Sequence, residues 1–467
     1  MSGSLVQYIQ LLNSSFLSQS PDQLYSAVPL SPDHPLFSHL RTALSAVSTS
    51  ALLPSAIAPF LGSISPDVRE GFTSFVLSLL RYVKGYKEDG DFGNVYEKFM
   101  TLVGVYTEVN KLYAQTSSEG VHLHPHLNPI ILSLAKQLVL ISNQAAALSP
   151  FPPRHDRSAR SIRDTTRQII ERSFQVSSTS LSDTEWAGCM GKDVLVGDIM
   201  WGLANVLWRI YAARKLHTQA ADLVRTFAAL QPAEEKRIHA RPQRIPRTDI
   251  CQAHYWRGRL GVVLLDMRNG RHWLDKAWEW CPSECWQQRR AILIRLIPVN
   301  LLLGRLPSFS LLDQYNLHEF SPLLHAFKSG NLPAWRKVLE HNREWFRRRS
   351  IWLILFERGE ILLWRNLFRF SVKTHYQLFP SAPRNRCPTR VFLNATRAAF
   401  SGTNEPEDED INLEDIICVL SSLIDQGLIL GHLSYSQQQL IMKPSEDGMG
   451  GFPRLGDVIP RRVEAII

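Results

Sequence analysis

Hydrophobic residues recur at helical spacing along most of the chain, and they are densest from residue 289 to residue 372. Apolar runs alternate there with short turn signals in the segments RRAILIRLIPVNLLLG, SPLLHAFKSGNLPAWRKVLEHNREWF and IWLILFERGEILLWRNLFRFSV. Apolar positions three and four residues apart lie on one face of a helix, which must pack against neighbours to leave water. The pattern therefore predicts a series of helices stacked on one another.

Turn signals set the ends of individual helices in this stretch. Ser321 places a capping hydroxyl before Pro322, which is tolerated at the first helical position, and Gly330 can adopt the left-handed conformation that ends a helix. We expect a short helix between these signals and a second, amphipathic helix over residues 331–346, capped by its asparagine. Residues 351–370 are apolar nearly all round, which predicts a helix covered on most faces.

Helical patterns continue upstream. Residues 66–115 and 128–148 are long and helical in spacing, and residues 192–225 resemble a helix-turn-helix repeat unit, which must stack because it cannot bury its own apolar face. No strict repeat period is visible, which indicates an irregular solenoid. We expect four parts: an N-terminal helical region with a basic loop near 149–172 (1–190), a helical-repeat part (191–380), a winged helix (381–445) and a C-terminal tail (446–467).

The spacing changes near the C-terminus. Asn412 can cap a helix that Gly427 ends, and residues 428–433 and 438–442 form two β-like runs around a turn. Helices followed by a β-hairpin are typical of a winged helix. We therefore expect this small domain to close the helical stack.

Composition places the chain among ordered proteins. Of its 467 residues, 45% are hydrophobic and 20% charged, and 52 lysines and arginines against 43 aspartates and glutamates leave a net charge of +9. A basic surplus favours an acidic partner, such as nucleic acid or an acidic protein. The six cysteines have no framework spacing, no run reaches the roughly 20 apolar residues of a membrane span, and the N-terminus lacks a basic secretory start. We expect an intracellular protein with free thiols.

The sequence contains no recognisable catalytic or cofactor-binding motif. The sequence has no phosphate-binding glycine loop, no nucleophile elbow and no histidine pair at helical ligand spacing, so we predict no enzymatic activity, no cofactor and no metal. His122, His124 and His126 alternate in a loop, and Cys281 and Cys285 lack further zinc ligands at partner spacing. The favoured interpretations are a loop before a helix and buried thiols, with metal binding as the alternative.

Two charged segments interrupt the helical pattern. The first, near 149–172, contains Arg154, Arg157, Arg160, Arg163, Arg167 and Arg172. It is interpreted as an exposed, partly disordered loop that continues into a solvated helix, and the alternative, which is compatible with it, is a nucleic-acid contact or a nuclear import signal. The second segment is the acidic run 405–410, which we expect to be a surface loop.

The central stretch resembles a known family. The segments LIPVNLLLG, SGNL and RNLF occur in the order and at about the spacing found in PCI domains, the helical module named for proteasome lid, signalosome and initiation factor. The match is to the branch of the signalosome-associated subunit twelve and the messenger-RNA export proteins of the transcription-and-export complex. The resemblance implies a mostly α fold, an irregular right-handed superhelix of TPR-like helix pairs that ends in a C-terminal winged helix with a short β-hairpin.

The resemblance also implies partners. The winged helix would assemble with other PCI or scaffold subunits, and a small acidic, disordered protein would follow the helical layers, whereas no membrane partner is expected. Tryptophans interleaved with arginines suit such an acidic peptide, with burial in the core as the alternative. The candidate partner-binding residues are Trp335, Arg343, Trp345, Arg347, Leu428, Ile429 and Leu430.

Nucleic acid is not expected to contact the recognition helix of the predicted winged helix. Residues 413–426 include Glu414, Asp415 and Asp425 and no basic residue, so phosphates would repel this helix. Basic residues gather beside it, and a solvated face of long side chains is the alternative interpretation. The candidate nucleic-acid contacts are Arg365, Arg369, Lys373, Arg384, Arg386, Arg390 and Arg397.

Together these features predict a non-catalytic PCI scaffold subunit. It would assemble a multiprotein complex and bind RNA or DNA without strong sequence preference, in nuclear messenger-RNA export and transcription-coupled processing. The alternative is a purely structural subunit associated with the signalosome or a proteasome-lid-like complex, without a role in nucleic-acid binding. The nucleus is the expected location, with the cytoplasm as a second one.

Overall fold

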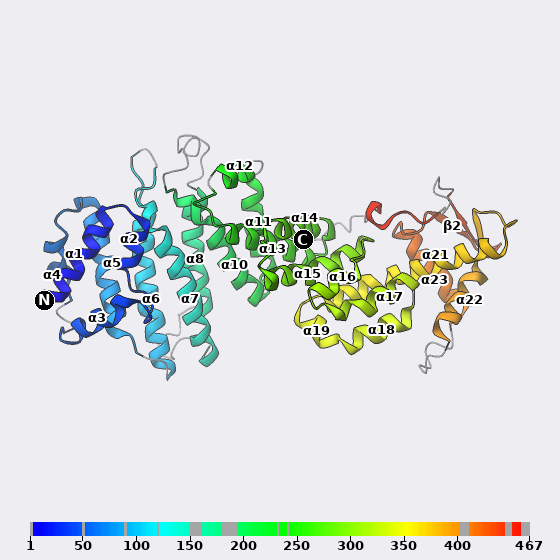
Figure 1. Cartoon of the computed structure of the whole chain (residues 1–467), viewed down its shortest axis with the longest axis horizontal. Helices are drawn as coiled ribbons and strands as arrows, with labels where there is room; N and C mark the ends of the chain where they lie inside the picture. Colours follow the sequence, from blue (N-terminus) through cyan, green and yellow to red (C-terminus); the bar gives the residue numbers. More distant parts are fainter. Residues whose placement is uncertain are drawn as a thin grey trace. The chain divides into compact units, whose positions relative to one another are not determined.

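The computed structural model shows a mostly helical protein with one small sheet (Figure 1). Its packing forms two compact units, Met1–Trp256 and Arg257–Ile467, and the boundary falls within helix α13 (Arg247–Val263). The predicted fold class, helical repeats followed by a C-terminal winged helix, is confirmed. The structure describes residues 3–48, 52–87, 91–118, 121–149, 161–179, 194–230, 233–240, 242–401, 411–443 and 451–458.

The first unit is built from helices that follow one another closely in space. Prolines occupy the first turn of several of them, where the missing N–H costs no hydrogen bond. The predicted helical patterns over 66–115 and 128–148 are confirmed as α5, α6 and α7. The α-helices of this unit are α1 (Gly3–Leu17), α2 (Pro21–Ala27), α3 (Pro35–Ser45), α4 (Pro54–Ile57), α5 (Pro66–Gly85), α6 (Phe92–Tyr113), α7 (Asn128–Leu148), α8 (Ile162–Thr179), α10 (Met200–Arg214), α11 (His217–Ala229) and α12 (Ala233–Ala240).

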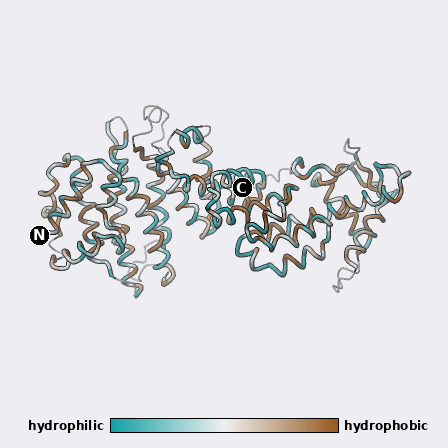
Figure 2. Tube along the Cα trace, viewed as in Figure 1, coloured by the Kyte–Doolittle hydropathy of each residue, from teal (hydrophilic) through white to brown (hydrophobic). Residues whose placement is uncertain are grey.

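Helix α7 is long and rich in apolar residues. Together with the turn before it, Pro125–Leu148 is long and apolar enough to cross a membrane by length and composition alone. Half of the apolar window is buried inside the protein, where α7 packs against α6 and α8. Burial of this kind is typical of a core helix, and hydrophobic and hydrophilic residues alternate along the helices of the chain as amphipathic packing requires (Figure 2).

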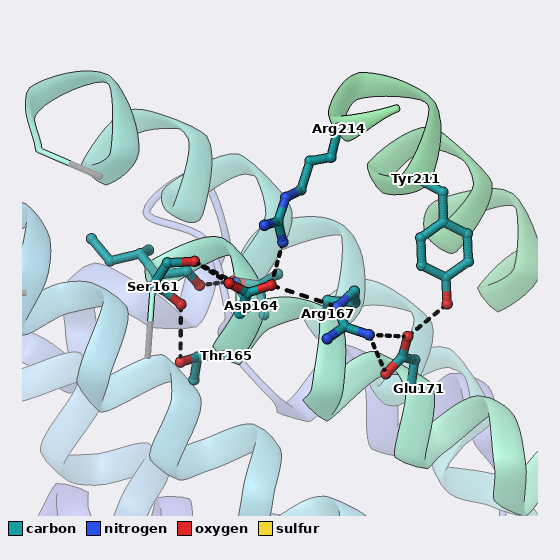
Figure 3. Close-up of polar contacts among 9 residues, drawn as sticks. Ser161, Asp164, Thr165, Arg167, Glu171, Tyr211 and Arg214 are labelled. Atoms are coloured by element: carbon teal, nitrogen blue, oxygen red, sulfur yellow. Dashed lines mark hydrogen bonds and ion pairs between the residues drawn. The ribbon is translucent and has the colours of Figure 1, made fainter. Parts of the chain in front are cut away.

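A polar network joins α8 to α10 (Figure 3). Arg214 forms an ion pair with Asp164, and Tyr211 donates a hydrogen bond of 2.7 Å to Oε1 of Glu171. Arg167 lies between the two carboxylates, with its Nη1 2.9 Å from Glu171 Oε1. Part of the basic segment predicted to be solvated is therefore structural. Arg163 and Arg172 are exposed on α8, while Arg154, Arg157 and Arg160 lie outside the described residues.

The alternating histidines pack against an aromatic ring. His124 and His126 are buried, and their ring centroids lie 5.3 Å and 4.9 Å from that of Phe16. Burial lowers the pKa of each imidazole to about 4. Because a charged imidazole would lose its hydration here, both rings are neutral at physiological pH. Across the described part of the chain, no group of three histidine, cysteine or acidic side chains is placed to hold a metal ion.

The second unit stacks helices in pairs before the winged helix. Gly330 ends α17 with a left-handed φ of 69°, as predicted. The predicted capping by Ser321 is wrong, because Ser321 is the first helical residue and Phe320 occupies the capping position. The helices are α14 (Met267–Trp280), α15 (Trp286–Leu302), α16 (Phe309–Gln314), α17 (Ser321–Ser329), α18 (Leu332–His341), α19 (Arg343–Arg348), α20 (Trp352–Ile354), a π-helical turn (Leu355–Gly359) and α21 (Glu360–Leu378).

The helix predicted over 331–346 is two helices. Asn331 caps α18 as expected, since its Oδ1 accepts a 3.0 Å hydrogen bond from Ala334 N. Asn342 then leaves the helical conformation, and its side-chain amide donates to Val338 O at 3.2 Å. A side chain that bonds the backbone in this way competes with helix continuation. The prediction of one continuous helix is therefore wrong, and a separate helix, α19, begins at Arg343.

The winged helix consists of β1 (Arg386–Pro388), α22 (Thr389–Phe400), α23 (Leu413–Asp425), β2 (Gly431–Ser434) and β3 (Gln439–Met442). The sheet order is β1-β3-β2, and both pairs are antiparallel. The predicted hairpin is confirmed as β2 and β3. Strand β1 was not predicted, because only three residues with one buried side chain, Cys387, give no visible alternation. The acidic run 405–410 lies outside the described residues.

Candidate nucleic-acid and partner interface

Helix α21 fixes the winged helix on the end of the helical stack. The rings of Phe368 and Phe392 lie 5.0 Å apart, and those of Trp364 and Phe400 lie 6.0 Å apart. Through these contacts, aromatic side chains of α21 pack against aromatic side chains of α22. The geometry of any surface shared by α21 and the winged helix is therefore set by buried aromatic packing.

Arg365 is part of this packing and is only 3% exposed. Its guanidinium donates a hydrogen bond of 3.2 Å to Leu428 O and a second one to Pro453 O. Burial lowers the pKa of Arg365 to about 10, so the group stays charged at neutral pH. Because it is enclosed, Arg365 is withdrawn from the candidate nucleic-acid contacts.

The next turns of α21 carry two exposed cations. Arg369 and Lys373 follow Arg365 at intervals of one helical turn, and both are exposed. One turn later, the hydroxyl of Tyr376 donates a 3.2 Å hydrogen bond to Arg386 O. This bond holds the end of α21 against the start of β1.

Two further positions add to this group of cations. Arg384 and Arg386 are exposed at the start of β1. Strands β1 and β3 pair Arg386 with Ile441, and the amide of Met442 donates a 2.8 Å hydrogen bond to Asn385 O. Continued by one more residue, the same register places Arg384 opposite Lys443. Lys443 is exposed too, and it was not among the predicted contacts because its position depends on strand register. The α21/β1 basic surface is defined by these residues: Arg369, Lys373, Arg384, Arg386 and Lys443.

The α21/β1 basic surface has no acidic partner among the described residues. None of the ion pairs found there includes any of its five cations. Arginines elsewhere in the second unit do pair, for example Arg336 with Glu360 and Arg348 with Glu344. Within the described part of the chain, no ion pair neutralises these five cations.

Two predicted arginines lie elsewhere on the winged helix. Arg390 is exposed in the first turn of α22, next to Thr389, which donates two 2.9 Å hydrogen bonds to Gln438 O in the hairpin turn. Arg397 is near the opposite end of α22 and donates to Ile411 O at 3.1 Å. Of the seven predicted arginines and lysines, four belong to the α21/β1 basic surface as defined, Arg365 is buried, and Arg390 and Arg397 lie on α22.

Helix α23 has an acidic exposed face. Glu414 and Asp415 are exposed at its N-terminus, where Asn412 and Asp415 form a capping box. Ile416, Leu420 and Leu423 form its buried face. The acidic residues thus stabilise the helix N-terminus and face solvent, which opposes insertion of α23 into a groove lined by phosphates.

The predicted partner residues divide into core and surface. Trp335 is fully buried, and Leu428 and Ile429 are 7% and 1% exposed, so these three are withdrawn as partner contacts. Their side chains pack inside the unit, where an apolar side chain loses the most contact with water. The surface members are Arg343, Arg347 and Leu430, while Trp345 is half-buried with the Arg349 guanidinium 3.8 Å from its ring centroid.

Strand β2 provides an open sheet edge. It is the last strand in the order β1-β3-β2 and pairs only with β3 within the described sheet. Leu430, which is 41% exposed, directly precedes it. An unpaired strand edge is a template for pairing with another chain.

Comparisons with known proteins give several relatives, although no family model matches the chain. A PCI domain-containing protein of Schizosaccharomyces pombe is 26% identical over 98% of this chain and 96% of its own length. PCI domain-containing protein 2 homolog of Caenorhabditis elegans is 31% identical over 71% of this chain and 72% of its own. PCI domain-containing protein 2 of Xenopus laevis is 31% identical over 55% of this chain, which matches 58% of that relative.

Proposed function

We propose that this chain, which belongs to the PCI domain-containing protein 2 family, is a non-catalytic scaffold subunit. In this proposal it binds nucleic acid through the α21/β1 basic surface. The observation that supports this proposal is the gathering of five exposed cations without an acidic partner in the described structure, held by the hydrogen bond from Tyr376 to Arg386 O. Phosphates would neutralise this surface and release their own counterions.

The mode of binding follows from the chemistry of these residues. Lysine and arginine contacts to phosphate give affinity without base readout. The acidic face of α23 disfavours docking of that helix in a major groove. We therefore expect salt-dependent binding with little sequence preference, at the side of the winged helix.

The proposed setting is nuclear messenger-RNA export and transcription-coupled processing. Its support is the resemblance to the PCI proteins of that branch. Other PCI or scaffold subunits would pair with the winged helix at β2, whose edge is open and lies next to exposed Leu430. A small acidic, disordered protein would follow the helical layers, where the exposed Arg343 and Arg347 are candidates for its contacts.

The direct test is a binding titration with fluorescently labelled RNA and DNA over a series of salt concentrations. The double variant Arg384→Glu/Arg386→Glu is expected to lower affinity about tenfold or more at low salt and to reduce the slope of log K against log salt by about two. The matched control is Arg209→Glu/Lys337→Glu, which changes net charge equally at exposed positions on α10 and α18. Unchanged binding by a folded Arg384→Glu/Arg386→Glu variant would refute the proposal.

A second candidate function is a purely structural subunit of a signalosome-associated or lid-like complex. The open edge of β2 favours it, because strand pairing requires no cations. It predicts co-purification with other PCI subunits that is lost when Leu433→Pro blocks the edge, and nucleic-acid affinity no greater than that of a neutral control protein.

A further inference from the structure

A serine in the second unit directly follows a run of three arginines. Residues 347–350, here named the Ser350 loop, read Arg-Arg-Arg-Ser. Ser350 is the only serine or threonine of the chain with basic residues at both the second and the third position before it. Ser350, Arg347 and Arg348 are all exposed. Protein kinases select their substrates by charge patterns, and arginines at these two positions suit a kinase whose substrate groove is acidic.

The backbone gives no structural reason for a serine at this position. Ser350 has a left-handed φ of 57°, and its amide donates a 2.9 Å hydrogen bond to Arg347 O at the end of α19. In the same turn the amide of Ile351 donates a 3.1 Å hydrogen bond to Phe346 O. Glycine or asparagine is favoured where a helix ends in this way. Within the described part of the chain the Ser350 hydroxyl forms no hydrogen bond, so it is free to react.

The Ser350 loop can open at little cost. A kinase binds its substrate as an extended chain, so the last turn of α19 must unwind during the reaction. Helix α19 has only six residues, and a helix this short has few hydrogen bonds to lose. None of residues 347–350 is buried, but the next residue, Ile351, is only 1% exposed. We therefore expect the folded chain to react, although more slowly than a peptide of the same sequence.

Positive charges gather around the Ser350 loop. Of its three arginines, only Arg348 has an ion-pair partner among the described residues, Glu344 at 2.7 Å. Burial lowers the pKa of Arg349, and the nearby charge of Arg290 on α15 lowers it further. A phosphoserine carries a charge of about −1.5 to −2 at pH 7 and three acceptor oxygens. In this loop it would find guanidinium partners and neutralise much of their charge.

We propose that Ser350 is a phosphorylation site for an arginine-directed protein kinase, and that its phosphate neutralises the arginines of the Ser350 loop. In the reaction, the γ-phosphorus of ATP forms a bond to the Ser350 hydroxyl oxygen, and its bond to the oxygen that bridges to the β-phosphate breaks. The hydroxyl proton passes to the catalytic aspartate of the kinase, and ADP leaves.

The phosphate would regulate the proposed contact with an acidic protein. Arg347 is one of the two candidates for that contact, and it lies in the Ser350 loop. A phosphate there repels carboxylates and competes with them for the same guanidinium groups. This regulatory part of the inference rests on the proposed function, whereas the phosphorylation of Ser350 does not.

The first experiment measures phosphorylation. The full chain is incubated with radiolabelled ATP and the catalytic subunit of cyclic-AMP-dependent protein kinase, which is arginine-directed, and the phosphate is located by mass spectrometry. We expect phosphate on Ser350. The variant Arg347→Gln/Arg348→Gln should lower the rate at Ser350 about tenfold or more. The matched control Arg209→Gln/Lys337→Gln, which removes the same charge at exposed positions on α10 and α18, should retain the rate within about twofold.

Two further samples make the first experiment decisive. Ser350→Gly removes the acceptor hydroxyl at a position where glycine suits the backbone, so the variant should fold and carry no phosphate at residue 350. A synthetic peptide of residues 344–353 reports whether the kinase accepts the sequence. Absence of phosphate on Ser350 of the folded chain, with or without labelling of the peptide, overturns the inference. Equal rates for Arg347→Gln/Arg348→Gln and the wild type overturn it as well.

The second experiment measures the regulatory effect with a fluorescently labelled peptide rich in glutamate and tryptophan. Phosphorylated wild-type chain should bind this peptide about fivefold or more weakly than untreated chain, and kinase-treated Ser350→Gly should bind it like the untreated chain. Equal binding by the two wild-type forms overturns the regulatory part. If neither form binds the peptide, the acidic partner of the proposed function and its regulation are both refuted, while phosphate found on Ser350 still establishes the modification site.

Discussion

The guanidinium of Arg365 donates a hydrogen bond to the main-chain carbonyl of Pro453, which follows it by 88 residues. Through this contact, residues 451–458 connect the winged helix to the helical stack. Phe452 is 9% exposed, and Arg268 of α14 donates hydrogen bonds of 3.0 Å and 3.1 Å to the carbonyls of Gly456 and Val458. Arg365 therefore has a structural role.

Replacement of Arg365 by methionine should destabilise the second unit. It leaves the carbonyls of Leu428 and Pro453 without their donor, and hydrogen bonds from a buried charged group are strong, so we expect a loss of about 3 kcal/mol in the free energy of unfolding. Urea denaturation measures this loss. Arg369→Met, at an exposed position one turn away, should lower nucleic-acid affinity with little change in stability. A reversed pattern would contradict the assignment of the two arginines.

Gly359 should not tolerate a side chain. A Cβ atom there would lie 2.4 Å from Cζ2 of the buried Trp335, in the π-helical turn that leads into α21. Gly359→Ala is expected to cost about 2 kcal/mol through overpacking. Gly104→Ala is the matched control, because a Cβ at Gly104 would meet no atom within 4 Å and alanine favours the helix by about 1 kcal/mol.

A second variant tests the physical cause of the Gly359 effect. Trp335→Leu removes the ring atoms that the new methyl group would meet. In a double-mutant cycle, Gly359→Ala should therefore cost less in the Trp335→Leu background than in the wild type. Additive costs would show that the methyl group acts on the backbone and not on Trp335.

Acid should destabilise the first unit through His124 and His126. Both pKa values fall to about 4 in the folded protein, below the unfolded value near 6.5. Between these values the unfolded chain binds more protons, so stability is complete above about pH 6.5 and decreases toward pH 4. The expected loss at pH 5 relative to pH 8 is about 2 kcal/mol per histidine.

Urea denaturation at the two pH values measures this dependence. His124→Gln/His126→Gln should reduce the difference between pH 5 and pH 8, whereas His217→Gln, at an exposed position, should leave it unchanged. An equal pH dependence in the histidine double variant and the wild type would show that other groups cause it.

The network between α8 and α10 should contribute modestly. Its side chains are partly exposed, 26% for Arg214 and 31% for Asp164, and solvent weakens such pairs, so Arg214→Gln is expected to cost about 1 kcal/mol. Arg209→Gln on the same helix is the control. The Arg214 side chain lowers the pKa of Asp164, so this contribution is present above the unfolded pKa of the carboxyl and is lost as pH falls through the lowered one.

Local sequence signals determined the helices, their main turns and the hairpin. Gly330 ends a helix because it has no side chain, and Asn331 and Asn412 begin helices because their side chains accept backbone hydrogen bonds. The acidic residues of α23 are evident from the sequence alone. Such features depend on residues within one or two turns, so periodicity and capping rules identify them. The break at Asn342 is an exception. One polar residue within an apolar pattern did not reveal that its side chain would donate a hydrogen bond to the carbonyl of Val338.

Only the tertiary structure decided which cations face solvent. Arg365, Arg369 and Lys373 follow one another at helical spacing and are equivalent in sequence, yet the partners that bury Arg365 come from 63 and 88 residues later. Strand register places Lys443 opposite Arg384. Trp335 is buried because Gly359, which has no side chain, allows its ring to approach the backbone closely. Burial and register depend on contacts between distant segments, whereas charge and helical period belong to the sequence itself.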